Sequence, residues 1–250
     1  MASDRMTSAS PAPAPEVLQG RVILIVGAHG ALGRASALAC AAAGAQVVLL
    51  GRKVPKLNRV YDAIAREGGE PLLYPLDLEG ATPADYAEMA ERIGGTLGRL
   101  DGILHCAADF PGLTPLEHVD PGVFARVLHV DLTARWWLTQ ACLPLLRAAP
   151  DAAVVFAIDP PDRTVHPYWG AYGIAQAGNA ALVSMLDGEL ASTSVRVCGF
   201  APGPMRSPLR AKAFVEDGDA AAVDPGAHAP ACVMLLSAAG AEHRGELFAG

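Results

Sequence analysis

The chain has 250 residues, of which 52% are hydrophobic and 18% are charged, and this is enough to bury a large core in one domain of α/β size. The formal net charge is -7 and no block of lysine or arginine is present, so the composition argues against binding to nucleic acid or to an anionic membrane. A small-molecule substrate, which the composition does not name, and protein partners remain.

The five cysteines are widely spaced in apolar surroundings, form no Cys-x-x-Cys pair and are odd in number. This usage is typical of buried free thiols in a reducing cytoplasm, and no metal site is expected. Residues 1–18 are rich in Ala, Ser and Pro and are predicted to form a disordered tail. They contain no apolar core of signal-peptide length, and no run in the chain reaches transmembrane length.

From residue 19 to residue 250 strands and helices are predicted to alternate, and no change of composition marks a second domain. Short apolar runs predict strands at 21–26, 46–50, 72–76, 100–107, 153–158, 195–200 and 246–249. Helices are predicted at 31–43, 54–66, 83–93, 121–147, 168–190 and 225–239. Helices at this spacing imply parallel strands with right-handed crossovers. The expected fold is a single α/β domain of Rossmann type, a doubly wound parallel sheet of about seven strands with helices on both faces.

A glycine-rich turn joins the first predicted strand to the first predicted helix. It reads Gly27-Ala-His-Gly-Ala-Leu-Gly, and in this context glycines let the backbone approach a pyrophosphate held at a helix N-terminus. We therefore expect the turn to bind a dinucleotide, although an ordinary turn between strand and helix is the alternative. The residues expected to contact the cofactor are Gly27, His29, Gly30, Leu32 and Gly33.

The end of the second predicted strand selects between the two dinucleotides. NAD-binding folds place an acidic residue there for the ribose 2′-hydroxyl, whereas this chain has Arg52 and Lys53. Two cations favour a 2′-phosphate, to which Arg52 offers a bidentate fork. NADP(H) is therefore predicted over NAD(H), unless both residues only begin a solvated helix.

The glycine turn, the topology and the segment around Tyr172 together resemble the short-chain dehydrogenase/reductase family, from about Gln19 to the C-terminus. The family's glycine pattern is Gly-x-x-x-Gly-x-Gly, and Ala31 stands where the family has its middle glycine. The resemblance implies that Asp77 contacts the adenine, whereas its other reading is the cap of a helix or turn.

The same resemblance implies further cofactor contacts after two later strands. Ala107 lies in the segment that matches the family's Asn-Ala-Gly motif, although Cys106 replaces the asparagine. Pro202 and Gly203 match the family's Pro-Gly turn beside the nicotinamide.

The resemblance also implies a catalytic set of tyrosine, lysine, serine and asparagine. Tyr172 matches the tyrosine that donates a proton to the carbonyl, but Gln176, four residues on and on the same helix face, replaces the lysine. Glutamine can bond ribose hydroxyls but has no charge to stabilise tyrosinate, so the pKa of Tyr172 is expected near its reference value of about 10. Asp159 takes the serine position. Asp131 takes the asparagine position, and its backbone carbonyl could still hold a water.

Charged Asp131 and Asp159 would raise the pKa of Tyr172, and Asp159 would also repel a developing oxyanion. His166, on the loop before Tyr172, is an alternative acid because histidine is the residue type whose reference pKa is nearest neutrality, or else it is a surface residue. Tyr172 itself could be a packing residue in an aromatic cluster with Tyr168 and Trp169.

The two long predicted helices, 121–147 and 168–190, carry apolar residues on more than one face. In the resembling family these helices form a four-helix dimer interface, so a homodimer or homotetramer is predicted, with ordinary core packing as the alternative. Residues 207–219 are expected to form a mobile flap over the pocket.

Two functions remain open at this point. The first is an NADP(H)-dependent oxidoreductase that acts on an unknown small carbonyl or alcohol, with weak activity or altered proton transfer. The retained cofactor residues and Tyr172 favour it. The second is a non-catalytic nucleotide-binding or assembly subunit, which the three altered catalytic positions favour.

Overall fold

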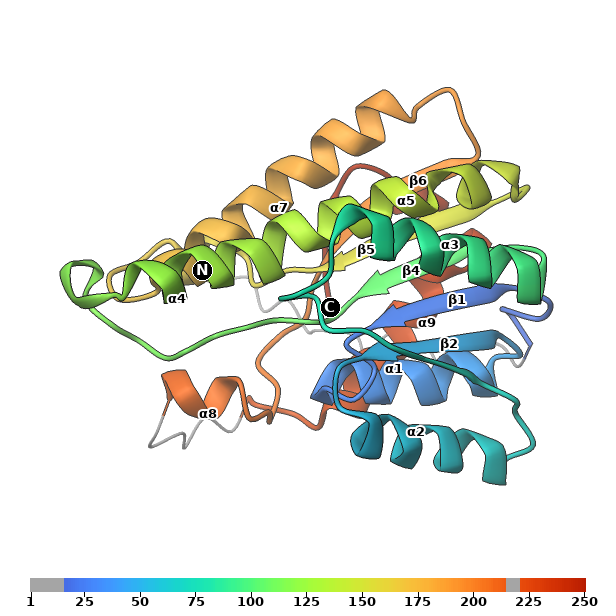
Figure 1. The fold of residues 1–250 in the computed structure, drawn as a ribbon, viewed down its shortest axis with the longest axis horizontal. Helices are drawn as coiled ribbons and strands as arrows, with labels where there is room; N and C mark the ends of the chain where they lie inside the picture. The colour runs from blue at the N-terminus through green and yellow to red at the C-terminus, as the bar shows by residue number, and fades with distance from the viewer. Residues whose placement is uncertain (1–15, 215–220) are drawn as a thin grey trace, which may run out of the picture.

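A computed structural model describes residues 16–214 and 221–250 of the chain (Figure 1). Its centre is one sheet of seven strands, in which every neighbouring pair runs parallel. The strands follow the order β3-β2-β1-β4-β5-β6-β7 across the sheet. Their bounds are β1 Val22–Val26, β2 Gln46–Gly51, β3 Leu72–Pro75, β4 Gly102–His105, β5 Ala152–Ala157, β6 Val195–Ala201 and β7 Leu247–Ala249. The predicted Rossmann-type sheet is confirmed.

The strands form where the sequence is continuously apolar, because both faces of the sheet are covered by helices. All five residues of β1 and all seven of β6 are buried. Helices α3, α5 and α7 lie on one side of the sheet, while α1, α2 and α9 lie on the other (Figure 1). The bounds are α1 Ala31–Ala42, α2 Val54–Arg66, α3 Pro83–Leu97, α5 Ala134–Ala148, α7 Gly170–Glu189 and α9 Ala229–Leu236.

The long helix predicted over 121–147 is not a single regular α-helix. Two α-helices, α4 (Pro121–Leu128) and α5, are joined by the π-helical turn η2 (His129–Thr133). A π-turn inserts an extra residue into the helix and is frequent at functional sites. Here it carries Asp131, the residue that takes the asparagine position.

Other predicted boundaries shift by a few residues. The helix predicted over 225–239 begins as the 3-10 turn η3 (Pro225–His228), and α9 ends at Leu236 before a second 3-10 turn, η4 (Ala238–His243). The remaining short elements are η1 (Leu116–His118), α6 (Pro161–Thr164) and α8 (Arg210–Ala213).

The folded chain begins earlier than the sequence predicted. Residues 1–15 of the expected tail lie outside the described residues, but Leu18 is fully buried and its N–H donates to the carbonyl of Ala43 at 2.8 Å. The expected boundary at residue 18 is therefore wrong, because Leu18 packs into the core between the sheet and α1. Of the expected flap over 207–219, residues 215–219 also lie outside the described residues.

The chain order places a cavity at the carboxyl ends of the strands. Strand β1 is followed by β2 and β3 on one side, and the connection through α3 then crosses to β4 on the other side. Two neighbouring connections thus leave β1 and β4 in opposite directions, and ligands of doubly wound sheets bind at this reversal.

Candidate active site

A cavity of about 470 Å³ opens at this reversal of strand order. Its walls come from the glycine turn after β1, the ends of β2, β4 and β5, helix α7 and the segment after β6. Nearly all residues predicted to bind a cofactor or to act in catalysis line it: Gly27, His29, Gly30, Leu32, Arg52, Asp77, Ala107, Asp159, Tyr172, Gln176, Pro202 and Gly203. The three predicted residues outside this lining are Gly33, Asp131 and His166.

Two glycines of the turn are required by its backbone. Gly27 has φ +83°, and a Cβ on it would lie 2.7 Å from the backbone of Ala107. A Cβ on Gly33 would lie 2.3 Å from the Gly27 carbonyl oxygen. Gly33 therefore packs against the backbone of the turn and does not line the cavity. Its lack of a side chain lets α1 pack close to β1.

The N-terminus of α1 is open towards the cavity. Its N-cap, Gly30, makes no side-chain cap hydrogen bond, so the first N–H groups keep their capacity to bind an anion. Ala31, at the position of the family's middle glycine, lines the cavity without closing it. The turn therefore fits a pyrophosphate.

A group of basic side chains surrounds the end of β2. Arg52, Lys53 and Lys56 line this part of the cavity together with His29. The pKa of His29 lies below its ordinary value because the ring is partly buried and because Lys56, Lys53 and Arg52 repel a further positive charge. Its Nδ1 atom has no hydrogen-bond partner among the described residues. These cations suit a dianionic 2′-phosphate better than an uncharged ribose hydroxyl.

Asp77 fits both of its predicted roles. It lines the cavity, and its Oδ1 also accepts the N–H of Glu79 at 3.2 Å, as a turn cap does. Arg52 Nη1 lies 3.8 Å from Asp77 and 3.7 Å from Glu79, and all three side chains are about half exposed. Such long, hydrated ion pairs are weak, so Arg52 remains able to turn towards a ligand phosphate.

Tyr172 forms a short hydrogen bond with the aspartate at the end of β5. Its hydroxyl donates to Oδ2 of Asp159 at 2.6 Å, and the tyrosine is only 4% exposed. The pKa of Tyr172 therefore lies well above its ordinary value, mainly because of burial and then because of Asp159 and Asp131. The expectation of a value near 10 is wrong, because it did not include burial of the ring.

Gln176 and Arg163 hold Asp159 from two further sides. The backbone N–H of Asp159 donates to Oε1 of Gln176 at 3.1 Å, and Arg163 Nη1 lies 3.4 Å from Asp159 Oδ1. Gln176 is buried beside Tyr172 on α7. It thus positions the loop that carries Asp159.

Asp131 lies behind the cavity wall in the π-turn and is fully buried. Its Oδ1 accepts the N–H of Asp109 at 2.7 Å, while Oδ2 has no partner among the described residues. Its carbonyl accepts Nδ2 of Asn179 at 2.8 Å. The expectation that this carbonyl holds a water stays a prediction, because a carbonyl oxygen that accepts one amide donor can accept a second hydrogen bond. Burial raises the pKa of Asp131 to about 7, although the charge of Arg135 opposes this shift.

The comparisons with known proteins agree with this geometry. A family model described as short chain dehydrogenase matches residues 21–217. The oxidoreductase YciK of Escherichia coli is 35% identical over 203 residues, which cover 81% of this chain and 80% of YciK. The chain belongs to the short chain dehydrogenase family. This is a family of oxidoreductases.

Solved structures of short chain dehydrogenases superpose closely. One from Pseudomonas syringae has a TM-score of 0.92 and 37% identity, covering 97% of this chain and 99% of that one. Another, from Escherichia coli CFT073 and complexed with NADPH, has a TM-score of 0.90 and 33% identity, covering 95% and 99%. The agreement extends over nearly the whole domain.

Within this short chain dehydrogenase, His166 does not reach the cavity. The residue is exposed, and its Nε2 lies 2.7 Å from the carbonyl oxygen of Asp162. The structure therefore does not place it as an alternative acid, because the loop turns its ring outward.

The aromatic cluster around Tyr172 differs from the one predicted. Phe110 and Trp169 pack on Tyr172 with ring centroids 5.0 Å and 5.9 Å away, whereas Tyr168 is more than half exposed. Trp169 is the partner named from the sequence, and Phe110 was missed because it lies 62 residues earlier in the chain.

Two more residues of this region were missed. Arg135 lines the cavity, and Asn179 binds the Asp131 carbonyl. Asn179 follows Gln176 by three residues, so the helix face that the two share was the available signal. Arg135 lies in a run read as helix packing, and it carried no motif signal.

No helix in the described part of the chain is long and apolar enough to cross a membrane. Within the same residues no group of three or more potential ligands could hold a metal ion.

Replacing Asp131 by asparagine is expected to reduce the pH dependence of stability. The pKa of Asp131 is about 7 in the folded protein, whereas that of an unfolded aspartate is about 3.9. Between these values only the folded state holds the proton, so stability falls as pH rises from about 4 to about 7, by a few kcal/mol. Urea unfolding at pH 4.5 and pH 8 should show a smaller difference for Asp131→Asn than for the parent. The exposed Asp62→Asn variant is the control, and an unchanged difference for Asp131→Asn would contradict the assignment.

Proposed function

We propose that the protein is an NADP(H)-dependent oxidoreductase that acts on a small alcohol or carbonyl compound. The observation that carries this proposal is that Tyr172, bonded to Asp159, shares one cavity with the glycine turn and the basic group at Arg52. A proton-transfer group and a cofactor-binding wall thus face the same space. The names of two solved relatives, complexed with NADP and with NADPH, support the choice of cofactor.

The Tyr172–Asp159 pair favours oxidation of an alcohol. The cofactor supplies the hydride acceptor, and every proton step falls to the chain's own side chains. As the alcohol loses its hydride, the Tyr172 oxygen accepts the hydroxyl proton while its own proton passes to the Asp159 carboxylate. One proton leaves the substrate and one arrives on Asp159, so no tyrosinate forms. The raised pKa of Tyr172 is no obstacle to this route.

Arg163 forms an ion pair with Asp159 from the other side. An ionised carboxylate is ready to accept a proton but has none to donate. Reduction of a carbonyl by the same pair would require protonated Asp159 first. We therefore expect alcohol oxidation to be favoured further as pH rises.

The alternative of a non-catalytic subunit gains no support from the comparisons, in which the relatives carry the names of oxidoreductases and dehydrogenases. It is retained as an outcome of the experiment. Calorimetric titration with NADPH and with NADH, followed by a screen of small alcohols with NADP⁺, tests the proposal. Micromolar NADPH binding and turnover that depends on Tyr172 would support it. Failure to bind either dinucleotide would refute it, and binding without any turnover would point to the non-catalytic subunit.

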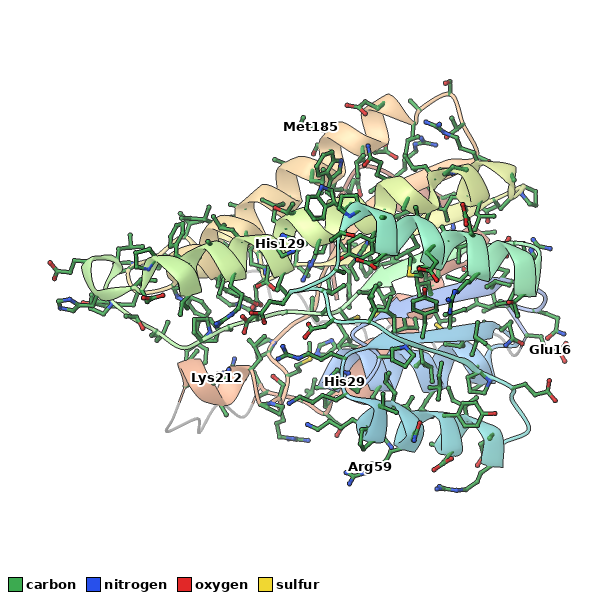
Figure 2. All side chains as sticks on the ribbon, viewed as in Figure 1. Glu16, His29, Arg59, His129, Met185 and Lys212 are labelled. Carbon is green, nitrogen blue, oxygen red and sulfur yellow. The ribbon has the colours of Figure 1, made fainter. Side chains whose placement is uncertain are left out.

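We also propose that the protein works as a homodimer or homotetramer in the cytoplasm. The outer surfaces of α5 and α7 expose large apolar side chains, with Trp136 at 41%, Ile174 at 50% and Met185 at 62% exposure. Met185 projects outward from α7 (Figure 2). Exposed apolar groups on neighbouring helices are typical of an interface. The five cysteines are free, which suits a reducing compartment.

Charges on this surface are expected to break the oligomer. The double variant Ile174→Glu and Met185→Glu would place carboxylates in an apolar contact, where their desolvation is unfavourable. Light scattering at micromolar concentration should give an oligomer for the parent and a monomer for the double variant. Val17→Glu, which changes an exposed valine outside both helices, is the control. A monomeric parent would contradict the proposal.

A further inference from the structure

Arg135, near the start of α5, is a buried cation inside the candidate active site. The residue is only 2% exposed, yet it lines the cavity together with Asp159, Tyr172 and Gln176. A guanidinium keeps its charge in proteins, and burying a charge is unfavourable unless something compensates for it. The burial of this charge beside the cavity therefore needs an explanation.

Its hydrogen bonds account for only part of the guanidinium. Nη1 donates to the Ala157 carbonyl at the end of β5 at 3.0 Å, and Nη2 donates to the Ala107 carbonyl beyond β4 at 2.5 Å. The Nε atom has no partner among the described residues. Several other arginines among the described residues form ion pairs with carboxylates, but no ion pair among these residues joins Arg135 to a carboxylate. Unused N–H donors thus remain on a charged residue that lines the cavity.

Two other cations of the cavity are already engaged. Arg163 pairs with Asp159, and Lys212 donates to the carbonyl of Phe110 at 2.6 Å. Lys212 lies on α8 and lines the cavity from there (Figure 2). Neither takes up the position that the missing lysine leaves beside Tyr172.

The charge of Arg135 acts on the pKa values of two acidic groups at the site. It opposes the upward shift of the pKa of Tyr172, and it does the same for Asp131. A lysine at position 176 would act on Tyr172 in the same sense. Gln176 lacks that charge, and its Oε1 is occupied by the Asp159 N–H.

We propose that Arg135 replaces the missing lysine: it supplies the positive charge beside Tyr172 and binds the nicotinamide half of the cofactor with its free N–H donors. This inference rests on the proposed function, because it requires NADP(H) in the cavity. The cation enters from α5 instead of α7, and Gln176 is free to hold the Asp159 loop. The loss of the lysine and the presence of a buried arginine then have one common explanation.

Cofactor affinity tests the inference without a known substrate. Arg135→Met removes the charge and the donors, and Arg135→Gln keeps neutral donors for the two carbonyls. Dissociation constants would be measured by fluorescence titration for NADPH and for adenosine 2′,5′-bisphosphate, which lacks the nicotinamide half. Loss of a charge-assisted hydrogen bond should weaken NADPH binding about tenfold to a hundredfold in both variants. Binding of the bisphosphate should change by less than about twofold, because its phosphates face the glycine turn and Arg52.

The decisive variant restores the lysine. Gln176→Lys in the Arg135→Met background should recover most of the NADPH affinity, whereas Gln176→Lys alone should give no gain. With an alcohol substrate in hand, the same double variant should also return the pH profile of kcat towards that of the parent. A purely structural arginine would show neither rescue, since a lysine at 176 does not rebuild the bonds to the two carbonyls.

The outcomes separate the two proposals. If the parent chain binds neither NADPH nor NADH, the proposed function and the role of Arg135 both fail. If the parent binds NADPH but Arg135→Gln does so equally well, or both ligands weaken together, or Gln176→Lys gives no rescue, the role of Arg135 alone is overturned. Thermal unfolding of each variant identifies a folding defect, and Arg135→Gln then serves in place of Arg135→Met, with Gln176→Lys added to it.

Discussion

Replacing Arg52 by aspartate is expected to invert the proposed preference for NADPH over NADH. Arg52 leads the basic group at the end of β2 and is held only by long ion pairs to Asp77 and Glu79. Loss of a charge-assisted bond to the 2′-phosphate should weaken NADPH binding about tenfold to a hundredfold, and the lower part of this range is expected because Arg52 is half exposed. A carboxylate there would also repel the phosphate and accept a hydrogen bond from the 2′-hydroxyl of NADH.

The measurement is a pair of dissociation constants, one for each dinucleotide, in the parent and in Arg52→Asp. The matched control is Arg59→Asp, seven residues later on α2, where the side chain is exposed and projects away from the cavity (Figure 2). It makes the same change in net charge, so it removes the effect of the overall field. Equal losses for both dinucleotides in Arg52→Asp would contradict recognition of a 2′-phosphate by this residue.

Removing the hydroxyl of Tyr172 is expected to have the largest effect on turnover. In the proposed mechanism Tyr172→Phe deletes the group that contacts the substrate oxygen and passes a proton to Asp159, so kcat should fall by about a thousandfold. NADPH affinity should change little, because the residues proposed to bind the cofactor are the glycine turn, Arg52 and other parts of the cavity wall. Turnover that survives in Tyr172→Phe would reject Tyr172 as the proton-transfer residue.

Asp159→Asn separates proton transfer from hydrogen bonding. An asparagine can still accept the Tyr172 hydroxyl hydrogen bond, but it cannot take up the proton. Alcohol oxidation should therefore fall about a hundredfold or more, while the protein remains folded and binds NADPH. Asp162→Asn, three residues later and exposed on α6, is the matched control. Full activity in Asp159→Asn would show that the substrate proton takes another route.

Much of the fold could be predicted because its signals are local in the chain. Continuous apolar runs become strands when both faces of a sheet are covered, and a glycine-rich turn between a strand and a helix requires its own backbone geometry. Gly27 illustrates this, since its positive φ is set by the turn in which it lies. Tyr172 and Gln176 could be paired for the same reason, because residues four positions apart lie on the same face of a helix.

The residues of the site could be predicted from the sequence, but their hydrogen-bond partners could not. Asp159 could be placed near Tyr172, but whether it would repel an oxyanion or accept the tyrosine proton depended on where its carboxylate pointed. Asn179 lies 48 residues from the Asp131 carbonyl that it binds. Contacts of this kind depend on the packing of separate elements, which local sequence patterns do not record.

Arg135 shows most clearly what the sequence could not predict. In the sequence it is one polar residue before two tryptophans in a helix, and nothing nearby distinguishes it from an exposed arginine. The sequence by itself determined the order of strands and helices, the dinucleotide turn, the cations after β2 and the absence of a lysine at position 176. The tertiary structure decided that Tyr172 donates to Asp159 and that a buried guanidinium on α5 lines the cavity. Both results depend on distances between segments that come together only when the helices pack on the sheet.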